Sequence, residues 1–253
     1  MHFRISVKGM PLFVFLKGMP AFLREYGEIK CQGEKAGGDF PFTRLYPCLT
    51  ERDQESGAIA EHYFHQDLFI ARKIFLNNPE RHVDIGSRVD GFVAHVATFR
   101  EIEVFDVRDL HLGIGNIRFT RADLTDTDFP FVDYCDSLSC LHALEHFGLG
   151  RYGDRLDYQG HLTGWDHLYR MLKTGGKLYF SVPIGRQRIE FNAHRVFSVA
   201  YLLRLMEGRY IIDSFSYIND EQKFITGAAL DEGSVVKNFG CHYGCGIFEL
   251  TKR

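Results

Sequence analysis

The chain has 253 residues, of which 45% are hydrophobic and 25% charged, and its formal net charge is −3. This composition predicts a folded domain with a sizeable core and excludes a chain that is disordered throughout. The small negative charge argues against sequence-independent binding of nucleic acid, and no apolar stretch is long enough to span a membrane, so we expect a cytoplasmic protein.

Residues 1–57 are predicted to form an extension ahead of a domain that covers residues 58–253. Glycine and proline interrupt the extension, so we expect it to be irregular. Within it the run Lys8-Gly-Met-Pro-Leu-Phe13 recurs as Lys17-Gly-Met-Pro-Ala-Phe22. Because proline after a flexible glycine suits the first turn of a helix, the repeat predicts two short helical starts, which we interpret as a brace against the core.

From residue 58 onward the chain shows helix and strand signals. Apolar residues recur at helical spacing over 58–75, which predicts an amphipathic helix. Strands are expected at 81–86, 101–106, 117–123, within 131–141, and at 177–183, 210–218 and 247–252. Further helices are expected at 92–99, 160–172 and 198–206, the second of them stopped by Gly175 and Gly176. This alternation predicts an α/β fold with a doubly wound, mostly parallel sheet.

The carboxyl ends of the first three strands are the expected ligand site, because doubly wound sheets bind ligands there. Gly86 permits a tight turn and a close approach of the backbone. Asp84 can accept hydrogen bonds from a ligand ammonium or from backbone amides, and Asp106 from both hydroxyls of a ribose. Asp123 can meet an adenine amino group. Three neighbours are expected to contact the same ligand: Ser87, Val107 and Leu124.

Two cofactors are compatible with such a site. A dinucleotide calls for G-x-G-x-x-G, whose backbone holds a pyrophosphate at a helix N-terminus. The run here is Gly86-Ser-Arg-Val-Asp-Gly91, which lacks the central glycine, and Asp90 would repel a pyrophosphate. S-adenosylmethionine carries an ammonium, a sulfonium and a ribose but no phosphate, so several acids suit it. We therefore predict S-adenosylmethionine as the cofactor.

Five segments connect the chain to a known family: His62-Tyr-Phe-His-Gln-Asp-Leu68, Val83-Asp-Ile-Gly-Ser87, Glu145-His-Phe-Gly-Leu-Gly-Arg-Tyr-Gly-Asp154, Ser181-Val-Pro-Ile-Gly-Arg186 and Phe191-Asn-Ala-His-Arg195. With them, residues 62–198 resemble a methyltransferase-like family of unknown function, first described in nematodes and also met in bacterial polysaccharide gene clusters. The resemblance implies a Rossmann-like class I methyltransferase sheet of seven strands, with the last strand antiparallel and the others parallel. Arg88 departs from the wider class I pattern, which has glycine there.

A group of histidines and one glutamate follows the fourth and fifth strands. If a helix begins after the fourth strand, His142, Glu145 and His146 stand at i, i+3 and i+4 and share one face. His194 comes from the same edge of the sheet. The layout is similar to that of metal-dependent small-RNA 2′-O-methyltransferases and quinone-precursor O-methyltransferases, which have glutamate in place of His142.

This similarity implies a divalent ion held by all four residues, for which iron, manganese, cobalt or zinc suits the ligands better than magnesium. An alternative of equal weight is base catalysis without a metal by His146 or His194, with Glu145 beside them. In a third interpretation, Glu145 and His146 only cap and pack the helix.

Residues near this group are candidate substrate contacts. The loop 148–153 places Arg151 and Tyr152 between glycines, as suits a loop that covers a substrate. Three arginines follow the fifth strand: Arg186, Arg188 and Arg195. Their guanidinium groups can bind a phosphate or carboxylate of the acceptor, and pairing with surface acids is the equally weighted alternative.

The six cysteines are expected to be reduced thiols. The run Cys241-His242-x-x-Cys245 has the spacing of half a zinc site but no second pair to complete it, so we favour a coincidence at a strand end.

Together these features predict a methyltransferase that uses S-adenosylmethionine to methylate a hydroxyl of a sugar or glycan intermediate. A hydroxyl is favoured over nitrogen because the loop after the fourth strand lacks the Asn/Asp-Pro-Pro-Tyr/Phe run of amino methyltransferases. A non-catalytic binding module with the same fold and an NAD-linked sugar enzyme are the alternatives. The expected partners are a small molecule or a glycan, and no nucleic acid.

Overall fold

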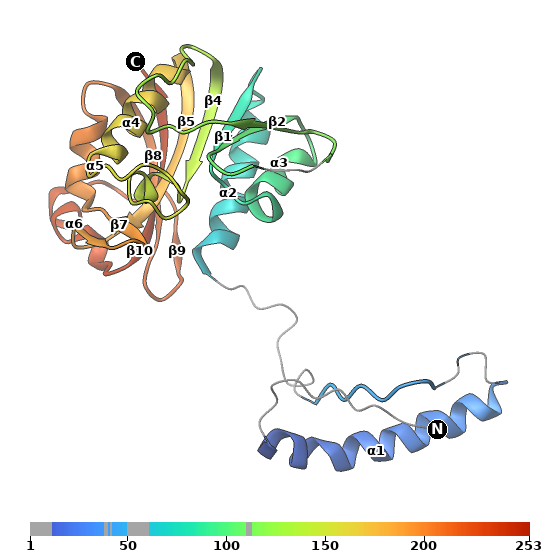
Figure 1. Ribbon diagram of the computed structural model, residues 1–253. Helices are drawn as coiled ribbons and strands as arrows, with labels where there is room; N and C mark the ends of the chain where they lie inside the picture. Colours follow the sequence, from blue (N-terminus) through green and yellow to red (C-terminus); the bar gives the residue numbers. More distant parts are fainter. Residues whose placement is uncertain (1–11, 38–39, 41, 50–60, 110–112) are drawn as a thin grey trace. The chain divides into compact units, whose positions relative to one another are not determined.

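The computed structural model describes residues 12–37, 40, 42–49, 61–109 and 113–253. The chain divides into two units, Met1–Ile59 and Ala60–Arg253 (Figure 1). The predicted domain boundary at residues 57–58 lies outside the described residues, and so does Pro11, at the first predicted helical start.

In the described part of the first unit, residues 12–35 form one long helix, α1 (Leu12–Lys35), so the predicted irregular chain and the second short helical start are wrong over these residues. Pro20, at the second predicted start, lies inside this helix. Proline removes one hydrogen bond from a helix interior, but most residues on either side of it favour the helical state. The chain that follows packs on α1, where the ring of Phe42 lies 5.6 Å from that of Tyr26. No described helix, α1 included, is both long and apolar enough to cross a membrane.

The second unit is built on a sheet in the order β3-β2-β1-β4-β5-β10-β8-β9. Its strands are β1 (His82–Ile85), β2 (Ile102–Asp106), β3 (Ile117–Arg121), β4 (Cys135–Leu141), β5 (Leu172–Ile184), β8 (Tyr210–Ile218), β9 (Phe224–Ile225) and β10 (Gly244–Lys252). Strands β1 to β5 are parallel, and β10 runs antiparallel to both β5 and β8. The predicted doubly wound sheet with an antiparallel last strand is therefore confirmed, and the two-residue β9 adds an eighth strand to the expected seven.

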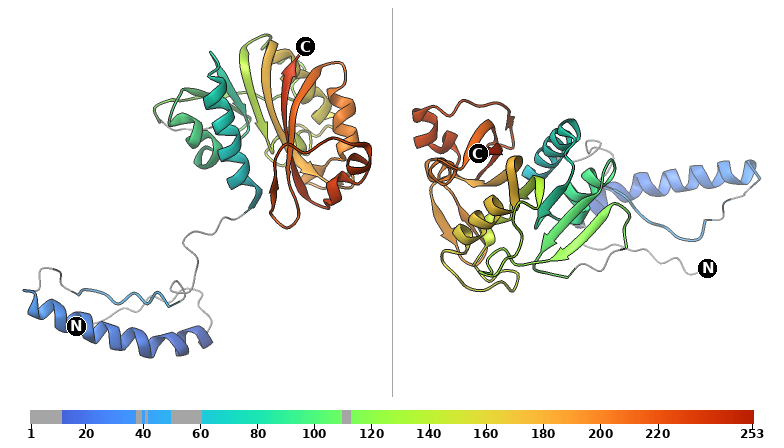
Figure 2. Two further views of the ribbon diagram at one scale, coloured as in Figure 1. Left: turned by 180° about the vertical axis from the view of Figure 1, so that it is seen from behind. Right: turned by 90° about the horizontal axis from the view of Figure 1, so that it is seen from above.

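Helices cover both faces of this sheet, as the two opposite views show (Figures 1 and 2). On one face α2 (Glu61–Asn77), a π-helical turn (Val89–Val93) and α3 (Ala94–Ala97) bury a core that includes Ile74 and Val96. On the other face α4 (Gly160–Met171) and α5 (Val199–Met206) bury a larger core around Trp165. The fold is thus three layers, and α6 (Glu232–Val236) follows β9.

The start of α5 is set by local sequence, whereas the end of α4 is not. Ser198, just before α5, accepts a hydrogen bond from the amide of Tyr201 and caps the helix, a position that serine favours. The expected stop of α4 at Gly175 and Gly176 is wrong, because α4 ends at Met171 and β5 begins at once with Leu172. Leu172 is extended and fully buried, and it pairs with Cys135 of β4, so burial in the sheet decides this boundary.

A hairpin of β6 (Arg188–Glu190) and β7 (His194–Val196) follows β5 outside the main sheet. A bridge between Ile184 and Phe197 ties the hairpin to the end of β5. Because β1, β2, β3, β4 and β5 are parallel, their carboxyl ends and this hairpin bring the predicted site residues to one edge of the sheet.

Candidate functional site

The turn after β1 places the backbone of Gly86 at the sheet edge. Gly86 has a φ of +74°, which glycine adopts at little cost, and its amide donates to the carbonyl of Phe105 on β2. A Cβ at this position would lie 3.1 Å from the Cβ of Ala143 in the loop after β4. The loops after β1 and β4 therefore approach each other closely, as the glycine predicted.

Asp84 lies behind this turn. Its side chain is fully buried, and its carboxylate accepts from the amide and hydroxyl of Ser87, each at 2.9 Å, and from the hydroxyl of Ser139 at 2.5 Å. Burial raises the pKa of Asp84 to about 6. The sequence predicted that Asp84 would accept hydrogen bonds from a ligand ammonium or from nearby groups of the chain. In the structure it accepts from nearby groups, and these bonds hold the turn after β1 in place.

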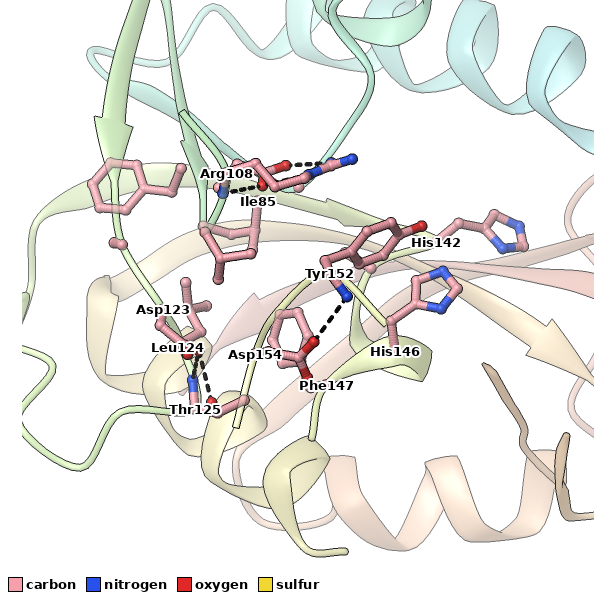
Figure 3. Close-up of a pocket in the computed structure, with 16 residues that line it drawn as sticks. Ile85, Arg108, Asp123, Leu124, Thr125, His142, His146, Phe147, Tyr152 and Asp154 are labelled. Carbon is pink, nitrogen blue, oxygen red and sulfur yellow. Dashed lines mark hydrogen bonds and ion pairs between the residues drawn. The ribbon is translucent and has the colours of Figure 1, made fainter. Parts of the chain in front are cut away.

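A pocket of about 540 Å³ opens at the ends of β1, β2 and β3 and beside the loop after β4 (Figure 3). Its lining comprises Ile85, Gly86, Phe105, Asp106, Val107, Arg108, Ala122, Asp123, Leu124, Thr125, His142, Ala143, His146, Phe147, Tyr152 and Asp154. Five of the seven predicted cofactor contacts line the pocket, while Asp84 and Ser87 do not.

Asp106, at the end of β2, holds an arginine in this structure. Both oxygens of its carboxylate bind the guanidinium of Arg108, at 3.0 and 2.7 Å, and one also accepts from the Arg108 amide. The guanidinium lies over the ring of Tyr152, 4.4 Å from its centroid. A ribose bound to Asp106 through two hydroxyls would have to displace the Arg108 side chain.

Asp123 and Leu124 lie at the far side of the pocket from the histidines (Figure 3). One carboxylate oxygen of Asp123 accepts from the amide and from the hydroxyl of Thr125, both at 2.7 Å. Thr125 therefore orients the acid, a role that the sequence analysis missed although the threonine stands only two residues away.

The segment after β4 brings three predicted residues together without the predicted helix. Only Leu144–His146 form a short 3₁₀ turn, and His142 precedes it with a φ of +51°. In this geometry the Nδ1 of His142 lies 2.9 Å from a carboxylate oxygen of Glu145, and the Nε2 of His146 lies 3.8 Å from the same oxygen. The prediction that these three residues share one face of a helix is wrong, because His142 has a left-handed backbone conformation where the first helical turn was expected.

The charges of this group are set by burial and by close neighbours. Burial favours the neutral form of His142, but Cys245 and Glu145 outweigh it and raise the pKa of this histidine well above its ordinary value. Burial also acts to raise the pKa of Glu145, yet the charge of His142 leaves that pKa lowered. His142 and Glu145 therefore form a buried ion pair.

His146 lines the pocket and differs from His142 in charge. Its Nδ1 donates to the carbonyl of Ala193 at 2.7 Å, so its Nε2 carries the lone pair. Burial lowers the pKa of His146 below its ordinary value, which keeps the imidazole neutral near neutral pH. Neutral charge and a fixed tautomer are what a general base needs.

His194 lies on β7, with its ring 6.5 Å from that of His146, and does not line the pocket. Its Nε2 lies 3.3 Å from the carboxylate of Glu190. In the part of the chain that the structure describes, the predicted metal set His142, Glu145, His146 and His194 does not gather its ligand atoms around one point. The reason is that Glu145 and the carbonyl of Ala193 engage the imidazoles in different directions.

The sequence matches a described protein family. Residues 108–239, just over half of the chain, match the family described as "Caenorhabditis protein of unknown function, DUF268". The chain belongs to this family. No protein with a curated description matches it.

Solved structures share the fold. The N-methyltransferase NodS from Bradyrhizobium japonicum WM9, in complex with S-adenosylhomocysteine, is 14% identical, with 77% of this chain and 89% of NodS covered and a TM-score of 0.52. Geranyl diphosphate methyltransferase in complex with S-adenosylmethionine is 12% identical, covering 75% of this chain and 85% of its own, at a TM-score of 0.51. The [4+2]-cyclase SpnF is 14% identical, with 98% and 99% covered and a TM-score of 0.56. This member of the family thus has the class I methyltransferase fold.

The loop expected to cover a substrate borders the pocket in this family member. The carboxylate of Asp154 accepts from the amides of Gly148, Gly150 and Tyr152 and so holds the loop in a tight turn. The ring of Tyr152 lines the pocket, while the guanidinium of Arg151 is exposed and donates to the carbonyl of Ala193 at 2.9 Å.

The three arginines after β5 do not form one anion site. Arg195 is buried and donates to the carbonyls of Phe147 and Tyr158, so it fixes the loop after β4. Arg188 pairs with Glu190 at 2.8 Å, as the alternative interpretation expected. Arg186 is exposed, and neither it nor Arg188 lines the pocket.

Two residues beside His142 were not predicted as part of a site. His62 of α2 and Cys245 of β10 are both buried close to it. Gln66, one helical turn after His62, accepts from the hydroxyl of Ser181 and lies 3.6 Å from the sulfur of Cys245. The i, i+4 spacing of His62 and Gln66 was the available signal, since it puts both on one face of α2.

Proposed function

We propose that this chain transfers a methyl group from S-adenosylmethionine to a hydroxyl oxygen. One observation carries the proposal: a single pocket is lined by Asp106 and Asp123, at neighbouring strand ends, and by the neutral base His146, which lies across the pocket from Asp123 (Figure 3). The two acids match the ribose and the adenine of the cofactor. The base lies where a hydroxyl acceptor would need to lose its proton.

The reaction needs little more than position and one proton acceptor. The acceptor oxygen attacks the methyl carbon in line with the sulfur, so the new carbon–oxygen bond forms as the carbon–sulfur bond breaks. The hydroxyl proton passes to the Nε2 of His146, and S-adenosylhomocysteine leaves with the electron pair on sulfur. Glu145, 3.8 Å from that nitrogen, stabilises the imidazolium that results.

A sugar or glycan hydroxyl is the acceptor that we propose. Tyr152 presents a partly exposed aromatic ring at the pocket, and aromatic faces suit sugar rings. The exposed side chains of Arg151, next to Tyr152, and of Arg186, just after β5, are the groups that we propose for a phosphate of a nucleotide sugar.

The test begins with binding. Calorimetry is expected to show S-adenosylmethionine binding to the wild-type protein and a loss of at least about tenfold in affinity for Asp106→Ala, since a bidentate contact to the ribose is removed. Asp109→Ala is the matched control, because Asp109 is an exposed acid three residues away that pairs with Arg121 and does not line the pocket. A wild-type protein that ignores the cofactor would refute the proposal.

Transfer is tested next, with tritiated cofactor and a panel of nucleotide sugars. We expect His146→Ala to lower kcat about 100- to 10,000-fold while the affinity for the cofactor stays unchanged, because the base acts on the acceptor alone. Equal rates for His146→Ala and wild type would remove His146 as the base.

A second candidate is a non-catalytic or differently catalytic protein on the same fold. The similarity to the cyclase SpnF supports this candidate, because SpnF has the same fold and is named for a different reaction. Cofactor binding without transfer to any hydroxyl of the panel would support this candidate.

A further inference from the structure

A second cluster of polar side chains lies next to the pocket, contributed by three distant parts of the chain. His62 comes from α2, His142 from the loop after β4, and Cys245 from β10. One potential ligand atom of each residue lies within 4.8 Å of the other two, and all three side chains are buried. Only His142 also lines the pocket described above.

The ring of His142 is held between a carboxylate and a thiol. Its Nδ1 lies 2.9 Å from Glu145, and its Nε2 faces the sulfur of Cys245 at 3.2 Å. A carboxylate on one ring nitrogen is the usual arrangement of a histidine that binds a metal, because the carboxylate orients the ring and strengthens the other nitrogen as a donor. A metal would take the place of the proton between the Nε2 of His142 and the sulfur of Cys245.

Glu145 gives an independent reason to expect positive charge here. The residue is almost completely buried, and its Oε2 has no hydrogen-bond partner among the described residues. A buried carboxylate oxygen without a partner is costly, and a nearby cation lowers that cost. Among the described residues, its close ionic partners are His142 and His146.

We propose that His62, His142 and Cys245 bind a zinc ion. Two imidazoles and one thiolate are a ligand set that zinc favours, and three protein ligands leave a fourth position open to water or to another donor. Around a tetrahedral zinc, neighbouring ligand atoms lie about 3.5 Å apart. The Nε2 of His142 and the sulfur of Cys245 lie slightly closer than this, at 3.2 Å, and the ligand atom of His62 lies within 4.8 Å of both, so zinc binding requires small side-chain movements.

The site differs from the four-residue set expected from the sequence. It keeps His142, and it has His62 and Cys245 in place of the other three residues. Because His142 borders the pocket, the open zinc position would be available to an acceptor oxygen, where zinc lowers the pKa of a hydroxyl. This last role rests on the proposed methyl transfer, whereas zinc binding itself does not.

The experiment uses the full chain, stripped with a chelator and then titrated with Zn²⁺ or Co²⁺ in the absence of S-adenosylmethionine. We expect one ion per chain and, with cobalt, the near-ultraviolet charge-transfer band of a thiolate ligand together with the visible bands of a tetrahedral site. Cys245→Ser should abolish the charge-transfer band, and His62→Ala should lower the affinity at least about tenfold.

Two control variants keep the test specific. Cys241→Ser removes a buried thiol four residues from Cys245, and His65→Ala removes the next histidine of α2, and neither residue belongs to the cluster. Both are expected to bind zinc as the wild type does. Trp165 fluorescence reports whether each variant is folded, because this buried residue is the one tryptophan of the chain.

A variant that fails to fold is replaced by a measurement on the wild type. In the folded wild type, cobalt should give the thiolate charge-transfer band, and zinc added in equal amount should displace the cobalt and remove the band. Stoichiometric binding that survives Cys245→Ser, or a wild-type chain that takes up no zinc, would overturn the proposal. Neither outcome bears on calorimetry with S-adenosylmethionine, so failure of this site and failure of the proposed reaction are separable.

Discussion

At the scale of single residues, Arg108 competes with the ligand that Asp106 is proposed to bind. Its guanidinium makes a two-pronged ion pair with Asp106 and adds a positive charge beside a cofactor that is itself cationic. About half of the Arg108 side chain is exposed, so the pair is screened by solvent and contributes about 1 kcal/mol. The proposed ribose contact has to replace this pair.

Arg108→Ala is therefore expected to tighten binding of S-adenosylmethionine about fivefold, because about 1 kcal/mol of competition is removed. Arg121→Ala is the matched control, since Arg121 is an exposed arginine in the same region that pairs with Asp109 instead. Calorimetry on both variants checks the prediction. Weaker binding by Arg108→Ala would mean that Arg108 contacts the cofactor rather than competing with it.

At the scale of elements, the loop between β4 and α4 depends on glycines that hold His146 and Tyr152 beside the pocket. Gly148 has a φ of +75°, and a Cβ there would overlap the carbonyl oxygen of Asp157. Gly153 has a similar φ of +86°, but a Cβ would meet no atom within 4 Å. The two positions share backbone strain and differ in available space.

We expect Gly153→Ala to lower the free energy of unfolding by about 1–2 kcal/mol, the cost of a left-handed alanine. Gly148→Ala should cost roughly 3–4 kcal/mol, because steric overlap adds to the strain. Urea unfolding followed by Trp165 fluorescence measures both. Equal losses for the two variants would show that the Asp157 carbonyl gives way easily.

At the scale of the whole molecule, buried histidines make stability depend on pH. Burial lowers the pKa of His82 to about 3 and those of His62 and His161 to about 4. An unfolded chain binds protons at these histidines below about pH 6.5 and the folded one does not, so their contribution is complete above pH 6.5 and is lost as the pH falls toward 4. Asp84, with its pKa raised to about 6, and His142, with its pKa raised by Cys245 and Glu145, have the opposite dependence. These two groups are outnumbered by the three histidines and His146, whose pKa burial also lowers.

The protein is therefore expected to lose stability between pH 7 and pH 5. His82→Gln should reduce that loss by about 2 kcal/mol, because glutamine keeps polar contact with Ser137 and Ser139 without taking up a proton in the unfolded chain. His242→Gln, at an exposed position, is the control. Urea unfolding at the two pH values checks this, and identical curves for His82→Gln and wild type would contradict it.

The sequence by itself determined the order of strands and helices, the doubly wound sheet and the strand-end acids Asp106 and Asp123. These follow from periodicity and from spacing along short segments, which act locally and are visible in residue order. Gly86 was predicted for the same reason, because a tight turn after a strand needs glycine wherever the rest of the chain lies.

Only the tertiary structure decided which of these residues face the pocket. Asp84 points inward because the hydroxyl of Ser139 on the neighbouring strand donates a hydrogen bond to its carboxylate. Arg195 is buried because it donates to the carbonyl of Phe147, 48 residues away in the chain. His142 meets Cys245 across 103 residues of sequence. Such partners depend on which segments fold side by side, and α1 likewise forms through its Pro20 because the summed preference of its other residues outweighs one local break.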